Sequence, residues 1–185
     1  YKNIHIMPNP GDAGSSLGAA ALHLYNTTGK KVNWNGPYLG HNIEGPYPVK
    51  KALASLKKGE LFGIANGRAE FGPRALGNRS LVADPRGPRV KDKMNTIKNR
   101  QKFRPFAPMI LEKYVHEYFD MPGGITNAPY MQFVAKCKKP EEFPAIIHED
   151  GTSRVQTVNQ KQHPGLYKLL SEYNKVTGCP MLVNT

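Results

Sequence analysis

Two neighbouring segments of the chain set cationic side chains among glycine, proline and aromatic residues. The first runs from Gly67 to Ser80 and the second from Lys98 to Pro108. Glycine lets backbone N–H groups approach a ligand, proline stiffens a loop, and a guanidinium fork matches the paired oxygens of phosphate or carboxylate. A solvated helix surface would instead interleave acidic and basic helix formers. The two segments therefore predict a site for a phosphorylated small molecule.

The basic residues of these segments are the candidate contacts of that anion. An arginine among apolar neighbours needs a partner, and Arg74, Arg79 and Arg104 all have such neighbours in the sequence. The candidate phosphate-binding residues are Arg68, Arg74, Arg79, Ser80, Arg100 and Lys102, and the candidate catalytic residues here are Lys98 and Arg104.

A second group of residues capable of chemistry runs from His148 to Arg154. Asp150-Gly151 is typical of a tight turn, and the two cationic or titratable residues flank it. We expect His148 to be catalytic and Arg154 to contact the substrate, while Glu70 could orient the nearby arginines or bind a metal ion. The sequence shows no Ser-His-Asp or Cys-His arrangement, which favours a mechanism based on positioning and charge.

Composition restricts the class of protein. With 185 residues, of which 39% are hydrophobic, the chain can form one full domain, alone or with a fragment of another. The net charge is +12, and residues 68–113 hold twelve Lys or Arg against four acids, so the charge is concentrated at the proposed site. Nucleic acid is the rival partner. It is less favoured because the basic residues lie in Gly/Pro loops without interleaved aromatic platforms.

Other features concern location and the cysteines. The sequence has no run of eighteen apolar residues and no signal-peptide pattern, so we expect a cytoplasmic protein without a membrane span. Cys137 and Cys179 lack metal or redox spacing, and we expect two small buried thiols rather than a disulfide. The chain starts without Met and stops after an apolar run, which suggests a piece of a longer protein.

Periodicity and turn residues predict an irregular mixture of helices and strands. Helices are expected over 15–25, 49–58, 90–97, 113–119 and 165–177, and strands over 3–7, 60–66, 79–83, 106–111, 131–137, 153–158 and 180–183. The Gly/Pro-containing segment 30–48 is expected to be an extended crossing with a domain boundary near 33–38. This order predicts an α/β fold of the mixed α+β type rather than a regularly doubly wound sheet.

Four separated blocks of the sequence resemble one known family. Residues 67–85, 95–108, 145–158 and 177–185 closely match, in this order, the C-terminal region of the O-carbamoyltransferases of nodulation-factor and antibiotic biosynthesis. The resemblance covers essentially the whole chain. It implies that residues 34–185 form a twisted mixed β-sheet of the YrdC-like type with flanking helices, truncated at its C-terminus. Residues 1–33 would be the strand-helix tail of an ASKHA-type domain.

The resemblance also implies an activity and its partners. In that family the YrdC-like lobe binds carbamoyl phosphate and ATP and forms carbamoyl adenylate, and the N-terminal ASKHA-type lobe of the same protein transfers the carbamoyl group to a hydroxyl-bearing acceptor. ATP would bring Mg²⁺. Asp12 matches an aspartate that helps hold a metal ion, Fe²⁺ or another divalent ion, in the ASKHA-type lobe, although a turn or helix N-cap role explains it as well. Asn184 and Thr185 match a segment that contacts nucleotide or phosphate.

Two alternatives remain within this resemblance. YrdC-like folds include RNA binders, and related synthases make threonylcarbamoyl adenylate from threonine, bicarbonate and ATP. The block from Glu70 to Gly77 fits the O-carbamoyltransferases better than those synthases.

Overall fold

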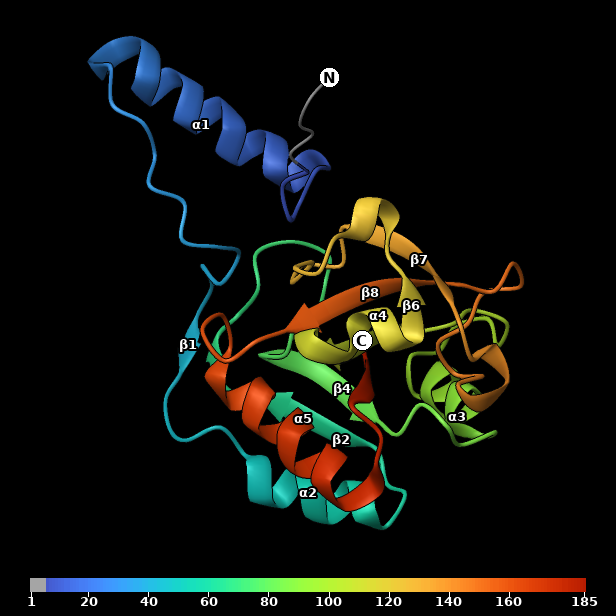
Figure 1. Ribbon diagram of the computed structural model, residues 1–185. Coiled ribbons are helices and arrows are strands. Elements are labelled where there is room, and N and C mark those ends of the chain that lie inside the picture. Colours follow the sequence, from blue (N-terminus) through green and yellow to red (C-terminus); the bar gives the residue numbers. More distant parts are fainter. Residues whose placement is uncertain (1–5) are drawn as a thin grey trace.

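A mixed sheet with helices on one face forms the body of the protein (Figure 1). The computed structural model describes residues 6–185, so most of the strand expected over 3–7 lies outside the described residues, and Ile6 and Met7 join no strand. The seven strands follow the order β2-β4-β9-β5-β8-β7-β6. Only β5 and β8 pair in parallel within the described chain. The predicted mixed α/β fold is confirmed.

The element bounds agree closely with the periodicity of the sequence. The strands of the sheet are β2 (Phe62–Ala65), β4 (Arg79–Ala83), β5 (Ala107–Leu111), β6 (Phe119–Asp120), β7 (Phe133–Cys137), β8 (Thr152–Val158) and β9 (Met181–Asn184). The helices are α1 (Asp12–Thr28), α2 (Val49–Lys57), α3 (Val90–Ile97), α4 (Val115–Tyr118) and α5 (Pro164–Thr177). Two further strands, β1 (Asn42–Ile43) and β3 (Gly67–Arg68), form a separate antiparallel pair.

Helix α5 is the main support of the sheet. Its buried residues Leu166, Leu169, Leu170 and Tyr173 recur at helical spacing and form one apolar stripe. The helix ends at Gly178, which has a φ of 70° and donates its N–H to the Asn174 carbonyl. Helices α2 and α5 pack against each other on the same face of the sheet (Figure 1).

The central strands β5 and β9 are buried along their whole length. They bring Met109, Ile110 and Leu182 into a single large core that also includes the α5 stripe. Cys137 and Cys179 belong to this core as free, buried thiols, which confirms the expectation for both. Burial raises the pKa of Cys179 to about 11 and also raises that of Cys137.

Helix α1 lies apart from the sheet (Figure 1). Gly14 is its buried residue, and a Cβ there would overlap the Asn9 carbonyl oxygen. The segment between Gly29 and His41 has no regular secondary structure and leads from α1 to the sheet, as expected for an extended crossing. The domain boundary at 33/34 stays a prediction. No helix within residues 6–185 has the length and apolar character needed to cross a membrane.

Candidate anion-binding site

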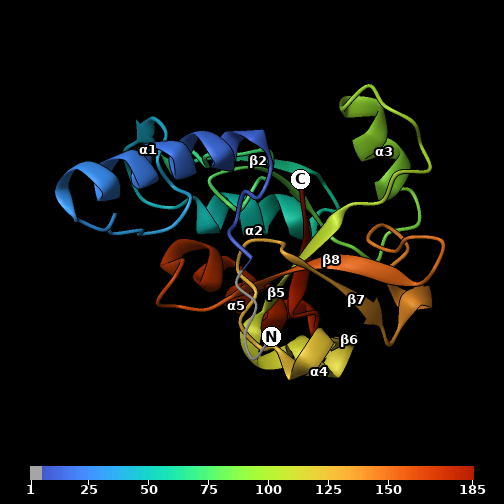
Figure 2. The same ribbon diagram turned by 90° about the horizontal axis from the view of Figure 1, so that it is seen from above.

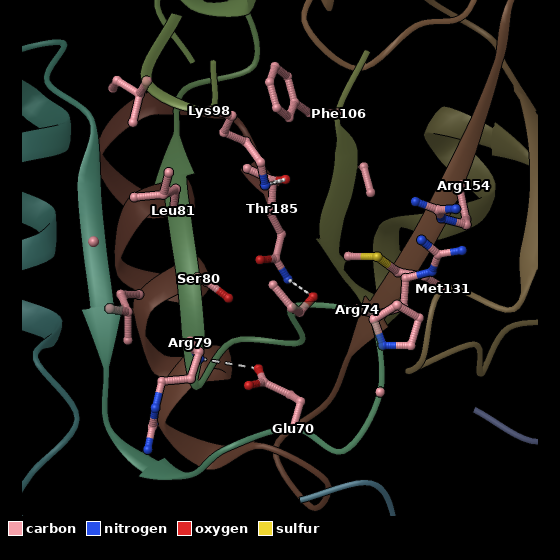
Figure 3. Close-up of a pocket in the computed structure, with 18 of the residues that line it drawn as sticks. Glu70, Arg74, Arg79, Ser80, Leu81, Lys98, Phe106, Met131, Arg154 and Thr185 are labelled. Atoms are coloured by element: carbon pink, nitrogen blue, oxygen red, sulfur yellow. Dashed lines mark hydrogen bonds between the residues drawn. The ribbon is translucent and has the colours of Figure 1, made fainter. Parts of the chain in front are cut away.

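A cavity of about 780 Å³ opens on the sheet face away from α5 (Figure 3). Its walls come from β2, β4, β8 and β9, from the loop 70–75, and from the segment that follows α3. The lining includes five basic residues, Arg74, Arg79, Lys98, Arg100 and Arg154, whereas Glu70 is its single acidic residue. The cavity is therefore strongly cationic.

Glu70 organises the loop that carries Arg74. Its Oε1 accepts hydrogen bonds from the backbone N–H groups of Leu76 at 2.7 Å, Asn78 at 2.9 Å and Arg79 at 3.3 Å. One carboxylate oxygen at the start of the loop thus holds the backbone at its end, and residues 70–79 form a closed loop. The sequence left two roles open for Glu70, orientation of the arginines and metal binding. These hydrogen bonds support the first role, and Glu70 acts on the backbone of the loop rather than on the guanidinium groups.

The same loop is held from outside by side chains of distant segments. Tyr47 Oη donates to the Gly77 carbonyl at 2.8 Å, and Tyr38 Oη donates to the Leu76 carbonyl at 3.2 Å. Gly77 has a φ of 117°, and a Cβ there would lie 2.8 Å from Leu166 Cδ2. Its N–H donates to Ser80 Oγ at 2.9 Å. The loop needs glycine at this position for both its backbone angle and its close packing.

Arg79 uses its guanidinium to hold the chain rather than to face the cavity. Its Nη1 donates to the carbonyls of Asn66, Gly67 and Asn78, and its Nη2 donates to the His41 carbonyl at 2.8 Å. Figure 3 shows the side chain directed away from the other cations. Arg79 therefore lines the cavity without offering it these donors.

Arg74 and Arg154 form the first cationic pair of the cavity. Their guanidinium groups lie close together in Figure 3, with Arg74 on the glycine-rich loop and Arg154 on β8. Burial and the nearby charge of Arg74 lower the pKa of Arg154. The buried Nε of Arg154 has no hydrogen-bond acceptor. Two adjacent guanidinium groups with a free buried donor are an arrangement suited to a bound anion.

Lys98 and Arg100 form the second cationic pair, at the end of α3. Lys98 Nζ donates to Thr185 Oγ1 at 2.8 Å, and Arg100 lies over the Phe106 ring at 4.5 Å from its centroid. Arg100 Nε donates to Asn95 Oδ1 at 2.7 Å. Burial and Arg100 lower the pKa of Lys98, and burial and Arg104 lower that of Arg100. Like charges are therefore crowded at this end as well.

None of these four cations forms an ion pair within the described chain. The salt bridges of residues 6–185 join Arg86 to Asp84, Lys138 to Asp120, Lys139 to Glu117 and Lys175 to Glu172, all away from the cavity. Charged groups gathered in a cavity without a counterion are unfavourable unless a ligand supplies the opposite charge. The predicted anion site is consistent with this geometry.

The structure brings together eight of the residues predicted from sequence and leaves five outside. Those that line the cavity are Arg74, Arg79, Ser80, Lys98, Arg100, Arg154, Asn184 and Thr185. The residues outside its lining are Asp12, Arg68, Lys102, Arg104 and His148. All five are exposed. Within residues 6–185 no group of three or more His, Cys, Asp or Glu could hold a metal ion, so a metal role for Asp12 stays a prediction.

Sequence reasoning missed His163, which precedes α5. Its Nδ1 accepts the Leu166 N–H at 3.1 Å as an N-terminal cap, so its Nε2 carries the proton and donates to Asn78 Oδ1 at 2.9 Å. Tyr38 and Tyr47 pack edge-on against the ring. Burial is the main cause that lowers the pKa of His163. A polar residue directly before Pro164 was the available signal, because proline is common in the first helical turn.

Gln156 and Asn95 were also missed. Gln156 Nε2 donates to the Leu76 carbonyl at 3.0 Å, and Asn95 Nδ2 donates to the carbonyls of Lys102 and Arg104. Both amides are buried and hold the loops that carry the cations. No sequence pattern marks such a residue, since its partners lie on other segments.

The chain is similar to known proteins over its full length. A family model described as "Carbamoyltransferase C-terminus" matches residues 53–185. Nodulation protein NolO of Bradyrhizobium diazoefficiens is 36% identical, with 100% of this chain and 38% of that protein aligned. Nodulation protein U of Azorhizobium caulinodans is 39% identical, with 100% of this chain and 35% of that protein aligned. The chain thus spans about a third of the length of these relatives.

Proposed function

We propose that this chain, which belongs to the carbamoyltransferase C-terminus family, binds carbamoyl phosphate and ATP in its cationic cavity and forms carbamoyl adenylate for O-carbamoylation of a hydroxyl acceptor. The observation that carries the proposal is the set of four basic side chains, Arg74, Lys98, Arg100 and Arg154, that line one cavity without an acidic partner in the described chain.

The donor set fits a polyphosphate ligand. Two pairs of cations stand on different walls, which suits two phosphorylated ligands or one long one, and the buried Arg154 Nε supplies a donor that no protein group uses. Mg²⁺ bound to ATP would neutralise part of the phosphate charge. Glu70 is the cavity's only carboxylate and its Oε1 serves the backbone, so the phosphates themselves would hold most of that ion.

The residues can contribute binding, charge neutralisation and orientation. Formation of carbamoyl adenylate would release pyrophosphate from ATP and inorganic phosphate from carbamoyl phosphate, with one water completing the balance. Guanidinium and ammonium groups placed before the reaction would stabilise the charge that spreads over the phosphoryl oxygens. The gathering of the cations around one cavity supports a small ligand over nucleic acid, which would favour basic residues spread along one surface.

The test uses the full-length gene product and its Arg154→Ala and Lys98→Ala variants. We expect carbamoyl phosphate or ATP to bind by calorimetry, and each variant to bind roughly 10- to 100-fold more weakly, since a charge-assisted hydrogen bond contributes about 1.5–3 kcal/mol. Lys50→Ala, an exposed lysine on α2, is the matched control and should bind normally.

Product analysis separates the alternatives. Pyrophosphate release that requires carbamoyl phosphate supports the proposal, whereas release with threonine and bicarbonate indicates the synthase alternative. RNA affinity with a steep salt dependence would favour nucleic-acid binding. Absence of carbamoyl phosphate binding would refute the proposal.

A further inference from the structure

One buried acceptor in the cavity wall has no donor. Asn184, on β9, is 1% exposed and lines the cavity. Its Nδ2 donates to the Ala75 carbonyl at 3.0 Å and to Gln156 Oε1 at 2.7 Å. Its Oδ1 accepts no hydrogen bond. Among the buried side-chain N and O atoms of residues 6–185, only the Arg154 Nε also lacks a hydrogen-bond partner.

The orientation of this amide is fixed by its neighbours. The carbonyls of Ala75 and Leu76 can only accept, so Gln156 must turn its NH₂ group to Leu76 and its Oε1 to Asn184. Asn184 then faces two acceptors and must present its NH₂ group to both. Rotation of either amide by half a turn would place its oxygen against the oxygen of a neighbouring carbonyl group. The Asn184 Oδ1 is consequently held in place as an acceptor that the protein does not use.

A ligand N–H in the cavity would supply the donor that this atom lacks. An unsatisfied buried acceptor is unfavourable, and in a native protein it calls for a partner. Arg74, Lys98 and Arg100 do not bond to it, although they line the same cavity. Phosphate oxygens cannot donate to it either. A carbamoyl group differs from other acyl groups in carrying an amino group with two N–H donors, which matches the missing partner.

We propose that Asn184 Oδ1 accepts a hydrogen bond from the amino group of the carbamoyl moiety and selects carbamoyl phosphate against acyl phosphates of the same shape. Gln156 is a positioning residue. It fixes the orientation of the Asn184 amide, and both polar atoms of its own side chain are already hydrogen-bonded within the protein. This inference rests on the proposed function. The exocyclic amine of adenine offers the same N–H chemistry, and the experiment separates these two sources.

The first measurement needs only the wild-type full-length protein. Acetyl phosphate replaces the amino group of carbamoyl phosphate by a methyl group of similar size. We expect carbamoyl phosphate to bind roughly 5- to 100-fold more tightly, the ratio expected when a buried polar group is left unpaired. In the second arm, ATP and a purine ribonucleoside triphosphate without the 6-amino group should bind equally.

Variants locate the discrimination. Asn184→Leu removes the acceptor, and the ratio of carbamoyl phosphate affinity to acetyl phosphate affinity should fall to about twofold or less. Gln156→Leu frees the Asn184 amide and should also reduce the preference. Asn174→Leu, a partly buried asparagine on α5, is the matched control and should change neither ratio.

Each outcome decides the inference. Equal wild-type affinity for carbamoyl and acetyl phosphate overturns it, whether or not the variants fold. Discrimination that survives Asn184→Leu also overturns it. Loss of the preference for ATP in that variant, with the carbamoyl preference intact, assigns the acceptor to adenine instead. If neither acyl phosphate binds the wild-type protein, the proposed function itself fails.

Discussion

Two loops and strand β8 supply the cations of the cavity, and the protein holds the two loops in different ways. In residues 70–79 a partly buried network of side chains binds the backbone, with Glu70 inside the loop and Tyr47 outside it. In residues 98–106 one side chain, Asn95, binds the backbone carbonyls and Arg100. Phe103, in the middle of this second loop, is 69% exposed.

The difference indicates which cations are in place before a ligand binds. A loop whose polar groups are already paired loses little entropy on binding, whereas an exposed loop must be ordered at that moment. Helix α3 and the loop after it project from the body of the protein (Figure 2). We therefore expect hydrogen exchange to show slow amides at 76–79 in the free protein and protection of 98–104 that increases with ligand.

The largest effect is expected from Glu70→Ala, which breaks the better-held loop. Three backbone N–H groups lose their shared acceptor, and hydrogen bonds to a charged group contribute about 1.5–3 kcal/mol each, so unfolding free energy should fall by roughly 3 kcal/mol or more. Urea unfolding measures the change. Glu44→Ala, at an exposed position, is the control. A loss below about 1 kcal/mol would mean that the network does not hold the loop.

Gly77→Ala tests the backbone of the same loop. The φ of 117° and the 2.8 Å approach of a Cβ to Leu166 should together reduce the unfolding free energy by about 2–3 kcal/mol. Gly18→Ala is the matched control. Gly18 lies within α1, where an added Cβ would meet no other atom, so the substitution should stabilise that helix slightly. Equal effects of the two substitutions in thermal unfolding would contradict the argument.

Asn95→Ala should separate the two loops most clearly. The carbonyls of Lys102 and Arg104 are on exposed residues that water can reach, so we expect a stability loss of only about 1–2 kcal/mol. Arg100 loses its orienting acceptor, and anion affinity should fall about tenfold. Calorimetry with ATP beside urea unfolding gives both numbers. A variant that binds normally would show that the second loop does not depend on Asn95.

The smallest effect concerns pH and His163. The pKa of His163 is lowered in the folded protein, mainly by burial, from its ordinary value of 6.5. Between the lowered pKa of the folded protein and 6.5, the unfolded chain binds more protons than the folded protein. The contribution of neutral His163 to stability is therefore complete above pH 6.5 and declines as the pH falls below that value. We expect the unfolding free energy to decline as the pH falls from 6.5 to 5, measured by urea unfolding. The His163→Gln variant should show a weaker decline, and an unchanged decline would assign it to other groups.

The sequence predicted local structure well and the cavity only in part. Strand 79–83 and helix 90–97 were expected with their observed bounds, because apolar periodicity and turn residues are local signals. The short strands β1 and β3 were missed, since two residues carry no periodicity. Arg154 was expected to contact the substrate and lines the cavity, while His148, six residues earlier, lies on an exposed turn outside it.

By itself the sequence determined that the chain is rich in cations among glycines and prolines, and which short segments become helices or strands. Tertiary structure alone decided which cations face the cavity: Arg79 turns to backbone carbonyls, whereas Arg74 meets Arg154 from a strand about eighty residues further along. The reason is that a side chain's direction depends on strand pairing and on hydrogen bonds from remote residues such as Tyr47 and Gln156. Neither leaves a local pattern.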